Sequence, residues 1–182
     1  MKFLKTTLPD VLVIEPEVFS DQRGSFFESF NRELFRKNGI SAEFVQDNHS
    51  VSARGVLRGL HYQVPPRAQA KLVRVVRGEA FDVVVDIRQN SNTFGRHACE
   101  ILSAENRKML YIPPGFAHGF LSLKEGTEFL YKVSDVYSPG HERGILWSDP
   151  ALKLPWPKME AGIVLSEKDK KYPPLAQAEK AF

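Results

Sequence analysis

The stretch KLVRVVRGEAFDVVVDIR, residues 71–88, decides the fold class. Its apolar side chains recur at every second position, which is the pattern of β-strands. Gly78 stands in its middle, where a turn is expected. Alternation places the side chains after the turn on two faces: Phe81, Val83, Val85 and Ile87 on one, and Asp82, Val84, Asp86 and Arg88 on the other. The stretch therefore predicts two consecutive strands that turn at Gly78.

Further short strands are expected on the C-terminal side of this stretch. Residues 97–123 predict several, with a turn at residues 104–106 and a break at residues 113–115; residues 127–140 predict one more, ending at Pro139-Gly140. One helix is expected near Ser29–Asn38, closed by Gly39, and the tail after Ser166 is expected to be partly helical. Many short strands without alternating helices indicate an all-β sandwich or barrel. We expect one domain over residues 1–182, with a few short peripheral helices.

Composition narrows the function classes. Of 182 residues, 42% are hydrophobic and 26% charged, which is typical of a globular protein. The net charge of +3, without a Lys/Arg cluster, gives no indication of nucleic acid, although it weakly favours an anionic ligand. We expect neither a membrane span nor a signal peptide. The single cysteine, Cys99, favours a reducing cytoplasmic setting.

Polar side chains interrupt the expected strands. His61, Lys71, Arg74, His118 and Tyr131 lie among aliphatic residues. A small barrel either fills its interior with side chains or holds one ligand there. Because charged groups are costly to bury without partners, this composition favours a ligand-binding interior.

The segment RGLHYQ, Arg58 to Gln63, poses a geometric problem. Arg58 and His61 are three residues apart, so a regular strand would direct them to opposite faces. Gly59 between them could host a β-bulge that redirects one side chain. We therefore expect the strand to be irregular at Gly59, or the two side chains to reach a ligand from different faces.

The histidines allow three interpretations. Any single one can be a hydrogen-bonded structural residue. Residues 113–118, PPGFAH, resemble the P-x-G-x-x-H element of metal-binding cupin barrels, but the second histidine of the usual H-x-H partner is replaced by Gln63, so no metal is expected. In the third interpretation, His61 takes up a proton near neutral pH, held by a carboxylate for which Asp169 is a candidate.

Several motifs then coincide in order. They are FVQDNHS (44–50), VLRGLHYQ (56–63), KLVR (71–74), IPPGFAHGF (112–120) and FLYK (129–132), with flanking matches from Arg23-Gly24 and Phe27-Glu28 to LSEKD (165–169). Together they resemble the dTDP-4-dehydrorhamnose 3,5-epimerase family over nearly the whole chain. The resemblance implies a cupin-like jelly-roll barrel, a homodimer with strands exchanged or packed between subunits, and no metal or organic cofactor.

The resemblance also implies the reaction, carried out by an isomerase. Its substrate is dTDP-4-dehydro-6-deoxy-D-glucose and its product dTDP-4-dehydro-6-deoxy-L-mannose, in the dTDP-L-rhamnose biosynthesis that supplies lipopolysaccharide and O-antigen. Protons on C3 and C5 are acidified by the C4 ketone, so inversion needs a base, a group that stabilises the enolate and an opposed acid. By resemblance, His61 is the base, Asp169 its partner, Lys71 stabilises the enolate oxygen and Tyr131 is the acid.

The remaining matched positions imply binding roles. The diphosphate and nearby polar groups would be bound by Arg23, Arg58 and Lys168, and the nucleotide or sugar would be hydrogen-bonded by Glu28, Gln46, Asp47 and Asn48. The thymine ring would stack on Tyr137, and the polar lining would be completed by His118 and Glu142. In the structural alternative, Arg23 and Glu28 form a surface ion pair, and the two tyrosines pack as ordinary core aromatics.

Three other functions stay open on the sequence. A relative could invert only C3 or only C5 of a dTDP-deoxysugar. A binding module could use the same barrel without catalysis. A metal-dependent cupin oxygenase or isomerase would contain bound iron, manganese or zinc.

Overall fold

The two strands expected around Gly78 are present, and they belong to different sheets. In the computed structural model, which describes residues 1–182, β7 (Lys71–Arg77) lies in a six-stranded sheet and β8 (Glu79–Asp86) in a five-stranded one. Gly78 has a φ of +77°, and a Cβ there would lie 2.7 Å from Thr127 Oγ1. The passage from one sheet to the other therefore requires glycine.

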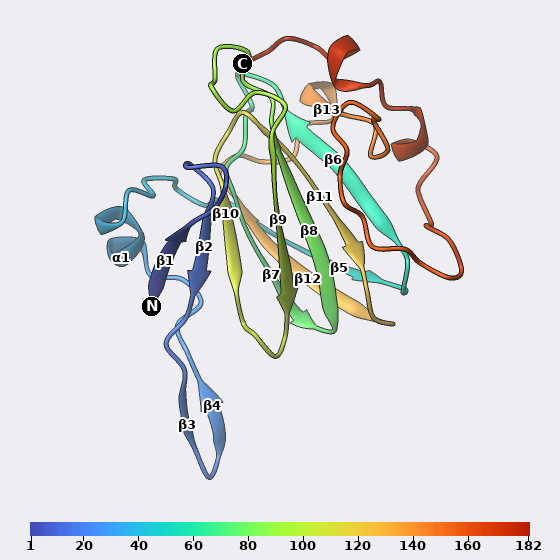
Figure 1. The fold of residues 1–182 in the computed structure, drawn as a ribbon. Coiled ribbons are helices and arrows are strands. Elements are labelled where there is room, and N and C mark those ends of the chain that lie inside the picture. Colours follow the sequence, from blue (N-terminus) through green and yellow to red (C-terminus); the bar gives the residue numbers. More distant parts are fainter.

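The regular secondary structure is almost entirely β, as predicted, and the two main sheets are antiparallel (Figure 1). The other strands are β1 Lys2–Lys5, β2 Leu12–Glu15, β3 Phe19–Asp21, β4 Gly24–Phe26, β5 Gln46–Ser52, β6 Leu57–Gln63, β9 His97–Ser103, β10 Met109–Ile112, β11 Phe116–Ser122, β12 Thr127–Val133 and β13 Glu142–Gly144. The larger sheet has the order β1-β2-β10-β7-β12-β5 and the smaller β13-β6-β11-β8-β9. This is the predicted cupin-like jelly roll.

Both faces of β8 are buried. Val84 packs between the sheets with Val73 of β7 and Phe129 of β12, so the even-numbered face points into the barrel. The odd-numbered face, which carries Val83 and Val85, is covered by the chain that follows β13. Asp82 shares the inward face and is completely buried, which places a carboxylate inside the barrel.

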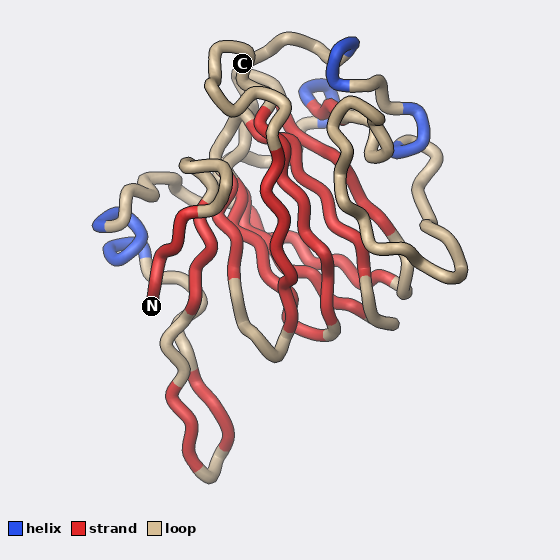
Figure 2. Tube along the Cα trace, viewed as in Figure 1, coloured by secondary structure: helices blue, strands red, loops and turns tan.

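Helical structure is short and peripheral (Figure 2). The expected helix near Ser29–Asn38 is confirmed, but α1 covers only Arg32–Lys37. It begins later because Asn31 is the N-cap, its side chain accepting a hydrogen bond from Leu34 N at 3.1 Å. The partly helical tail is also present, as the 3-10 turns η2 (Asp169–Lys171) and η3 (Leu175–Gln177). None of these short helices has the length and hydrophobicity that a membrane-spanning helix needs.

The strand expected to end at Pro139-Gly140 ends earlier, at Val133. Asp135 breaks the pairing, because its carboxylate accepts hydrogen bonds from its neighbour's backbone, Val136 N at 2.8 Å, and from Arg67 at 3.0 Å. A further 3-10 turn, η1 (Pro139–His141), follows. The connection between β12 and β13 is therefore a loop, and it carries Tyr137.

One basic residue does not lie where the sequence suggested, and a second lies far from the barrel of its own chain. Arg74 was expected among interior side chains, but alternation along β7 directs it to the outer face, where its guanidinium lies 5.6 Å from the centre of the Phe27 ring. Arg23 lies at the tip of the β3–β4 hairpin, which projects away from the barrel (Figure 1).

Candidate active site

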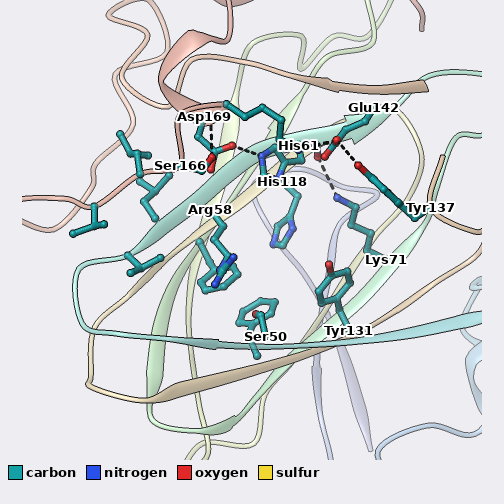
Figure 3. Close-up of a pocket in the computed structure, with 17 residues that line it drawn as sticks. Ser50, Arg58, His61, Lys71, His118, Tyr131, Tyr137, Glu142, Ser166 and Asp169 are labelled. Atoms are coloured by element: carbon teal, nitrogen blue, oxygen red, sulfur yellow. Dashed lines mark hydrogen bonds and ion pairs between the residues drawn. The ribbon is translucent and has the colours of Figure 1, made fainter. Parts of the chain in front are cut away.

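One cavity of about 590 Å3 opens between the sheets and under the segment 164–169 (Figure 3). Nine of the residues singled out from the sequence line it: Arg58, His61, Lys71, His118, Tyr131, Tyr137, Glu142, Lys168 and Asp169. They come from five strands, a loop and the C-terminal segment, so only the folded chain brings them together.

His61 and Asp169 form a hydrogen-bonded pair at one end of the cavity. His61 Nε2 lies 2.6 Å from Asp169 Oδ1, although 108 positions separate the residues in the chain. Burial alone would raise the pKa of Asp169, but the bond from His61 and its charge hold that pKa below its usual range. An ionised Asp169 fixes the Nε2–H tautomer and leaves the Nδ1 lone pair free to accept a proton.

The strand is irregular at Gly59, as expected. His61 pairs with His118 of β11 and Arg58 pairs with Phe120, so Gly59 and Leu60 together face a single residue of β11. Gly59 has a φ of +134°, and a Cβ there would lie 2.5 Å from the Cα of Gly119. This bulge lets Arg58 and His61 line the same cavity despite their odd spacing.

Lys71 places a buried ammonium beside His61. The residue is 8% exposed, and its Nζ donates a hydrogen bond to the backbone carbonyl of His61 at 3.1 Å. Burial lowers the pKa of Lys71 to about 8, partly opposed by the charges of Asp82 and Glu142. The side chain is thus a cation at neutral pH that can stabilise an oxyanion in the cavity.

Tyr131 lies across the cavity from His61, with its hydroxyl turned toward the interior (Figure 3). Burial raises its pKa, so the phenol keeps its proton at neutral pH. Phe129 and Phe120 form an apolar wall beside it, with stacked rings whose centroids are 4.0 Å apart. A histidine with a free lone pair therefore faces a protonated phenol across a partly apolar space.

One functional candidate was missed on the sequence. Asp82, completely buried on β8, lies 2.9 Å from His118 Nε2 and fixes the orientation of that imidazole. The available signal was an acidic residue inside the apolar run FDVVVD, on the same face as Val84. His118 is therefore held by a second carboxylate directly across the strand pair from His61.

The rim of the cavity carries a hydrogen-bonded cluster. Glu142 accepts bonds from the Tyr137 hydroxyl at 2.9 Å and from Lys168 Nζ at 2.8 Å. Burial alone would raise the pKa of Glu142, but these bonds lower it, whereas the bond to Glu142 raises the pKa of Tyr137. Lys168 and Tyr137 are thus held at the mouth.

Two predicted residues line an adjoining recess. Gln46 and Asn48 lie on one face of β5, beside Tyr131 and Tyr137. Asp47 points the opposite way, as period two requires, and pairs with Lys132 at 2.9 Å.

The other two predicted residues lie outside the cavity of their own chain. Arg23 pairs with Asp21 at 2.6 Å rather than with Glu28, which accepts a bond from Asn31. Nowhere do three or more His, Cys, Asp or Glu side chains gather in a way that could hold a metal ion.

An imidazole with a free lone pair and a protonated phenol on opposite sides of a cavity, with a buried cation beside the imidazole, suit proton transfer at a carbon next to a carbonyl. Fold and site together are those of an isomerase on a cupin-like barrel. The family model described as dTDP-4-dehydrorhamnose 3,5-epimerase matches residues 5–177. The chain belongs to the dTDP-4-dehydrorhamnose 3,5-epimerase family.

Individual relatives support this family assignment. A Pseudomonas aeruginosa dTDP-4-dehydrorhamnose 3,5-epimerase is 54% identical over 180 residues, covering 98% of both chains. A Legionella pneumophila epimerase solved with dTDP-4-keto-L-rhamnose has a TM-score of 0.93 at 45% identity, covering 97% of this chain and 93% of that one. ChmJ, a 3'-monoepimerase from Streptomyces bikiniensis in complex with dTDP-quinovose, has a TM-score of 0.89 at 37% identity, covering 94% and 87%.

Proposed function

We propose that this chain converts dTDP-4-dehydro-6-deoxy-D-glucose to dTDP-4-dehydro-6-deoxy-L-mannose by inverting C3 and C5, a step of dTDP-L-rhamnose biosynthesis. The observation that carries the proposal is the arrangement of His61 and Tyr131 on opposite sides of one cavity with Lys71 beside them (Figure 3). The test is to incubate the purified protein with this keto-sugar nucleotide and determine the product stereochemistry by NMR. An unchanged substrate would refute the proposal.

Each inversion follows from the positions of these groups. His61 removes the proton from the carbon next to the C4 ketone, and Asp169 stabilises the imidazolium that forms. The electron pair moves to the ketone oxygen, where the Lys71 ammonium stabilises the enolate. Tyr131 then returns a proton from the other side, so the carbon is inverted. His61 afterwards loses its proton and Tyr131 regains one from water, which restores both groups.

The binding roles follow the charges at the mouth. Arg58 and Lys168 suit the diphosphate, because cationic donors bind its oxygens through charge-assisted hydrogen bonds. Tyr137 is 51% exposed at the rim, where its ring face can stack on thymine. Gln46 and Asn48 in the adjoining recess can hydrogen-bond the nucleotide or sugar. In this proposal the protein needs neither a metal nor an organic cofactor, since its own side chains supply every proton transfer.

The projecting hairpin supports a homodimer. Phe19 and Phe26 on β3 and β4 are 58% and 67% exposed, and isolated two-stranded hairpins are marginally stable in water. A second copy of the chain would cover these rings, and Arg23 and Glu28 would then meet a partner's surface instead of solvent.

We expect the Phe19→Ser/Phe26→Ser variant to lose dimerisation, because it removes the apolar area that a partner would bury. Light scattering on the wild type and the variant checks this. A wild-type mass of one chain, or a variant that stays dimeric, would contradict the assignment of the hairpin to the interface.

We further place the enzyme in the cytoplasm, as one domain over residues 1–182, with rhamnose passing to surface glycans such as O-antigen lipopolysaccharide. The single unpaired cysteine, Cys99, supports a reducing compartment.

A single-centre epimerase is the second candidate, because the 3'-monoepimerase ChmJ shares this fold at a TM-score of 0.89. Such an enzyme would yield a product inverted at C3 alone or at C5 alone. The NMR assignment of the product at both carbons separates the two candidates.

Turnover should fall as pH rises through about 8. The pKa of Lys71 is lowered to about 8, so the ammonium is present below that pH and lost above it, together with its stabilisation of the enolate. The measurement is kcat against pH for the wild type and for Lys71→Gln, which has no ammonium to lose. If the same basic limb persists in Lys71→Gln, the limb belongs to another group.

Tyr131→Phe should separate proton removal from inversion. We expect net epimerisation to fall by ~100-fold, as for loss of a general acid, while His61 still exchanges the substrate's acidic proton with solvent. In deuterated water the variant should return labelled but uninverted substrate. The matched control is Tyr111→Phe on β10, outside the cavity, which should behave like the wild type. Normal inversion by Tyr131→Phe would remove Tyr131 from the acid role.

A further inference from the structure

Behind the His61–Asp169 pair lies a tyrosine that the proposed mechanism does not use. Tyr172 follows directly on η2, the turn that carries Asp169. Its ring meets the His61 imidazole edge to face, with centroids 5.6 Å apart and planes at 69°. Tyr172, which contacts the proposed base His61, is thus three residues along the chain from Asp169, the carboxylate that orients His61.

Gly144 makes room for this ring. The residue pairs with His61 across β13 and β6, so it lies beside the proposed base. A Cβ at Gly144 would lie 2.4–2.5 Å from three atoms of the Tyr172 ring. Gly144 does not have a positive φ, so the ring is what excludes a side chain there.

Backbone hydrogen bonds hold the chain on both sides of Tyr172. Asp169 N donates to Ser166 Oγ at 3.1 Å before the tyrosine, and Leu146 N donates to the carbonyl of Pro173 at 2.9 Å after it. The Tyr172 hydroxyl, by contrast, is buried without a hydrogen bond of normal geometry, although the charges of Glu142 and Lys168 at the cavity mouth act on it. An unpaired buried hydroxyl contributes no favourable bond, so the contact depends on the ring itself.

We propose that Tyr172 is a positioning residue for His61. Its ring, seated on Gly144, restricts the imidazole to the orientation that forms the 2.6 Å bond with Asp169 and keeps water from that side of the pair. The proposal rests on the proposed function of His61 as base. A misplaced reacting group commonly costs orders of magnitude in rate, so the arrangement bears on turnover more than on substrate affinity.

Tyr172→Ala should lower kcat by ~10- to 100-fold with KM little changed, since Tyr172 does not line the cavity. Tyr172→Phe keeps the ring and should retain wild-type kcat and pH profile, with an equal or higher Tm because a buried unpaired hydroxyl is removed. If Tyr172→Phe loses as much activity as Tyr172→Ala, the hydroxyl is responsible and the proposal fails.

Gly144→Ala supplies an independent test. It should lower kcat like Tyr172→Ala, because the new methyl displaces the ring. In the double variant Gly144→Ala/Tyr172→Ala, the new methyl occupies space that the ring has left. The loss of kcat should therefore be smaller than the sum of the two single-variant losses in free energy. Additive losses would show that Gly144 acts without Tyr172 and would overturn the proposal.

A purely structural role for Tyr172 is distinguished by NMR titration of labelled histidine, with the His61 signal assigned from its loss in His61→Ala. The proposal expects the His61 titration to shift in Tyr172→Ala and to remain in place in Tyr172→Phe. If Tyr172→Ala lowers Tm but leaves the His61 titration and kcat unchanged, the positioning role of Tyr172 is refuted, whatever the activity of His61→Ala.

If His61→Ala is active, the proposed role of His61 as base is refuted. The His61 titration in the Tyr172 variants then still shows whether Tyr172 positions the imidazole.

Discussion

His61→Ala is expected to lower turnover by at least two to three orders of magnitude. General acid–base catalysis contributes typically about 10²- to 10⁴-fold, and no other imidazole lies at this end of the cavity in contact with Asp169. Binding should suffer less, because Arg58, Lys168 and Tyr137 remain. The measurement is kcat and KM on dTDP-4-dehydro-6-deoxy-D-glucose.

The matched control is His49→Ala. His49 is an exposed histidine on β5, paired with Glu128 at 3.2 Å and outside the cavity, so its removal should leave kcat unchanged. Near-normal turnover of His61→Ala would refute the role of His61 as base, and would favour a non-catalytic binding module or another base.

Lys71→Gln is expected to lower kcat by ~100- to 1,000-fold, the usual effect of removing one donor that stabilises an oxyanion. The cation is lost where charge develops in the transition state, so kcat should fall more than KM rises. Glutamine is one atom shorter than lysine, but it keeps a polar amide that can donate a hydrogen bond without the charge. The readout is steady-state kinetics at pH 7, where the wild-type ammonium is present.

Lys108→Gln serves as its control, because Lys108 is paired with Glu100 at 2.8 Å outside the cavity. A Lys71→Gln variant that raises KM while keeping kcat would show that the ammonium binds the ground state only. That outcome would assign enolate stabilisation to another group.

Much of the fold could be predicted because the alternation of apolar and polar side chains in a strand can be seen within a short stretch of sequence. The strands on both sides of Gly78 follow from alternation. The odd spacing of Arg58 and His61 left two alternatives, an irregular strand at Gly59 or side chains on different faces, and the structure has the first. The end of β12 could not be predicted in this way. The segment after Val133 keeps apolar side chains, but Asp135 captures backbone and Arg67 partners that only the folded chain brings near.

The site, like the fold, has parts that could be predicted from the sequence and parts that depend on long-range contacts. Residue types and the family resemblance were sufficient to nominate His61, Lys71, Tyr131 and Asp169. Their distances depend on contacts between segments far apart in the chain, such as the 108 positions between His61 and Asp169. Asp82 was missed because an acid within an apolar strand has no local partner in the sequence. Nor could alternation reveal that Arg23 lies on a projecting hairpin, since the hairpin's place depends on what it packs against.

The most direct test of the proposed function is solvent exchange during turnover. The wild-type protein is incubated with dTDP-4-dehydro-6-deoxy-D-glucose in deuterated water, and the product is analysed by NMR. Removal and return of a proton at both carbons predicts deuterium at C3 and at C5, with both centres inverted. Deuterium at only one of the two carbons would contradict the 3,5-epimerase assignment.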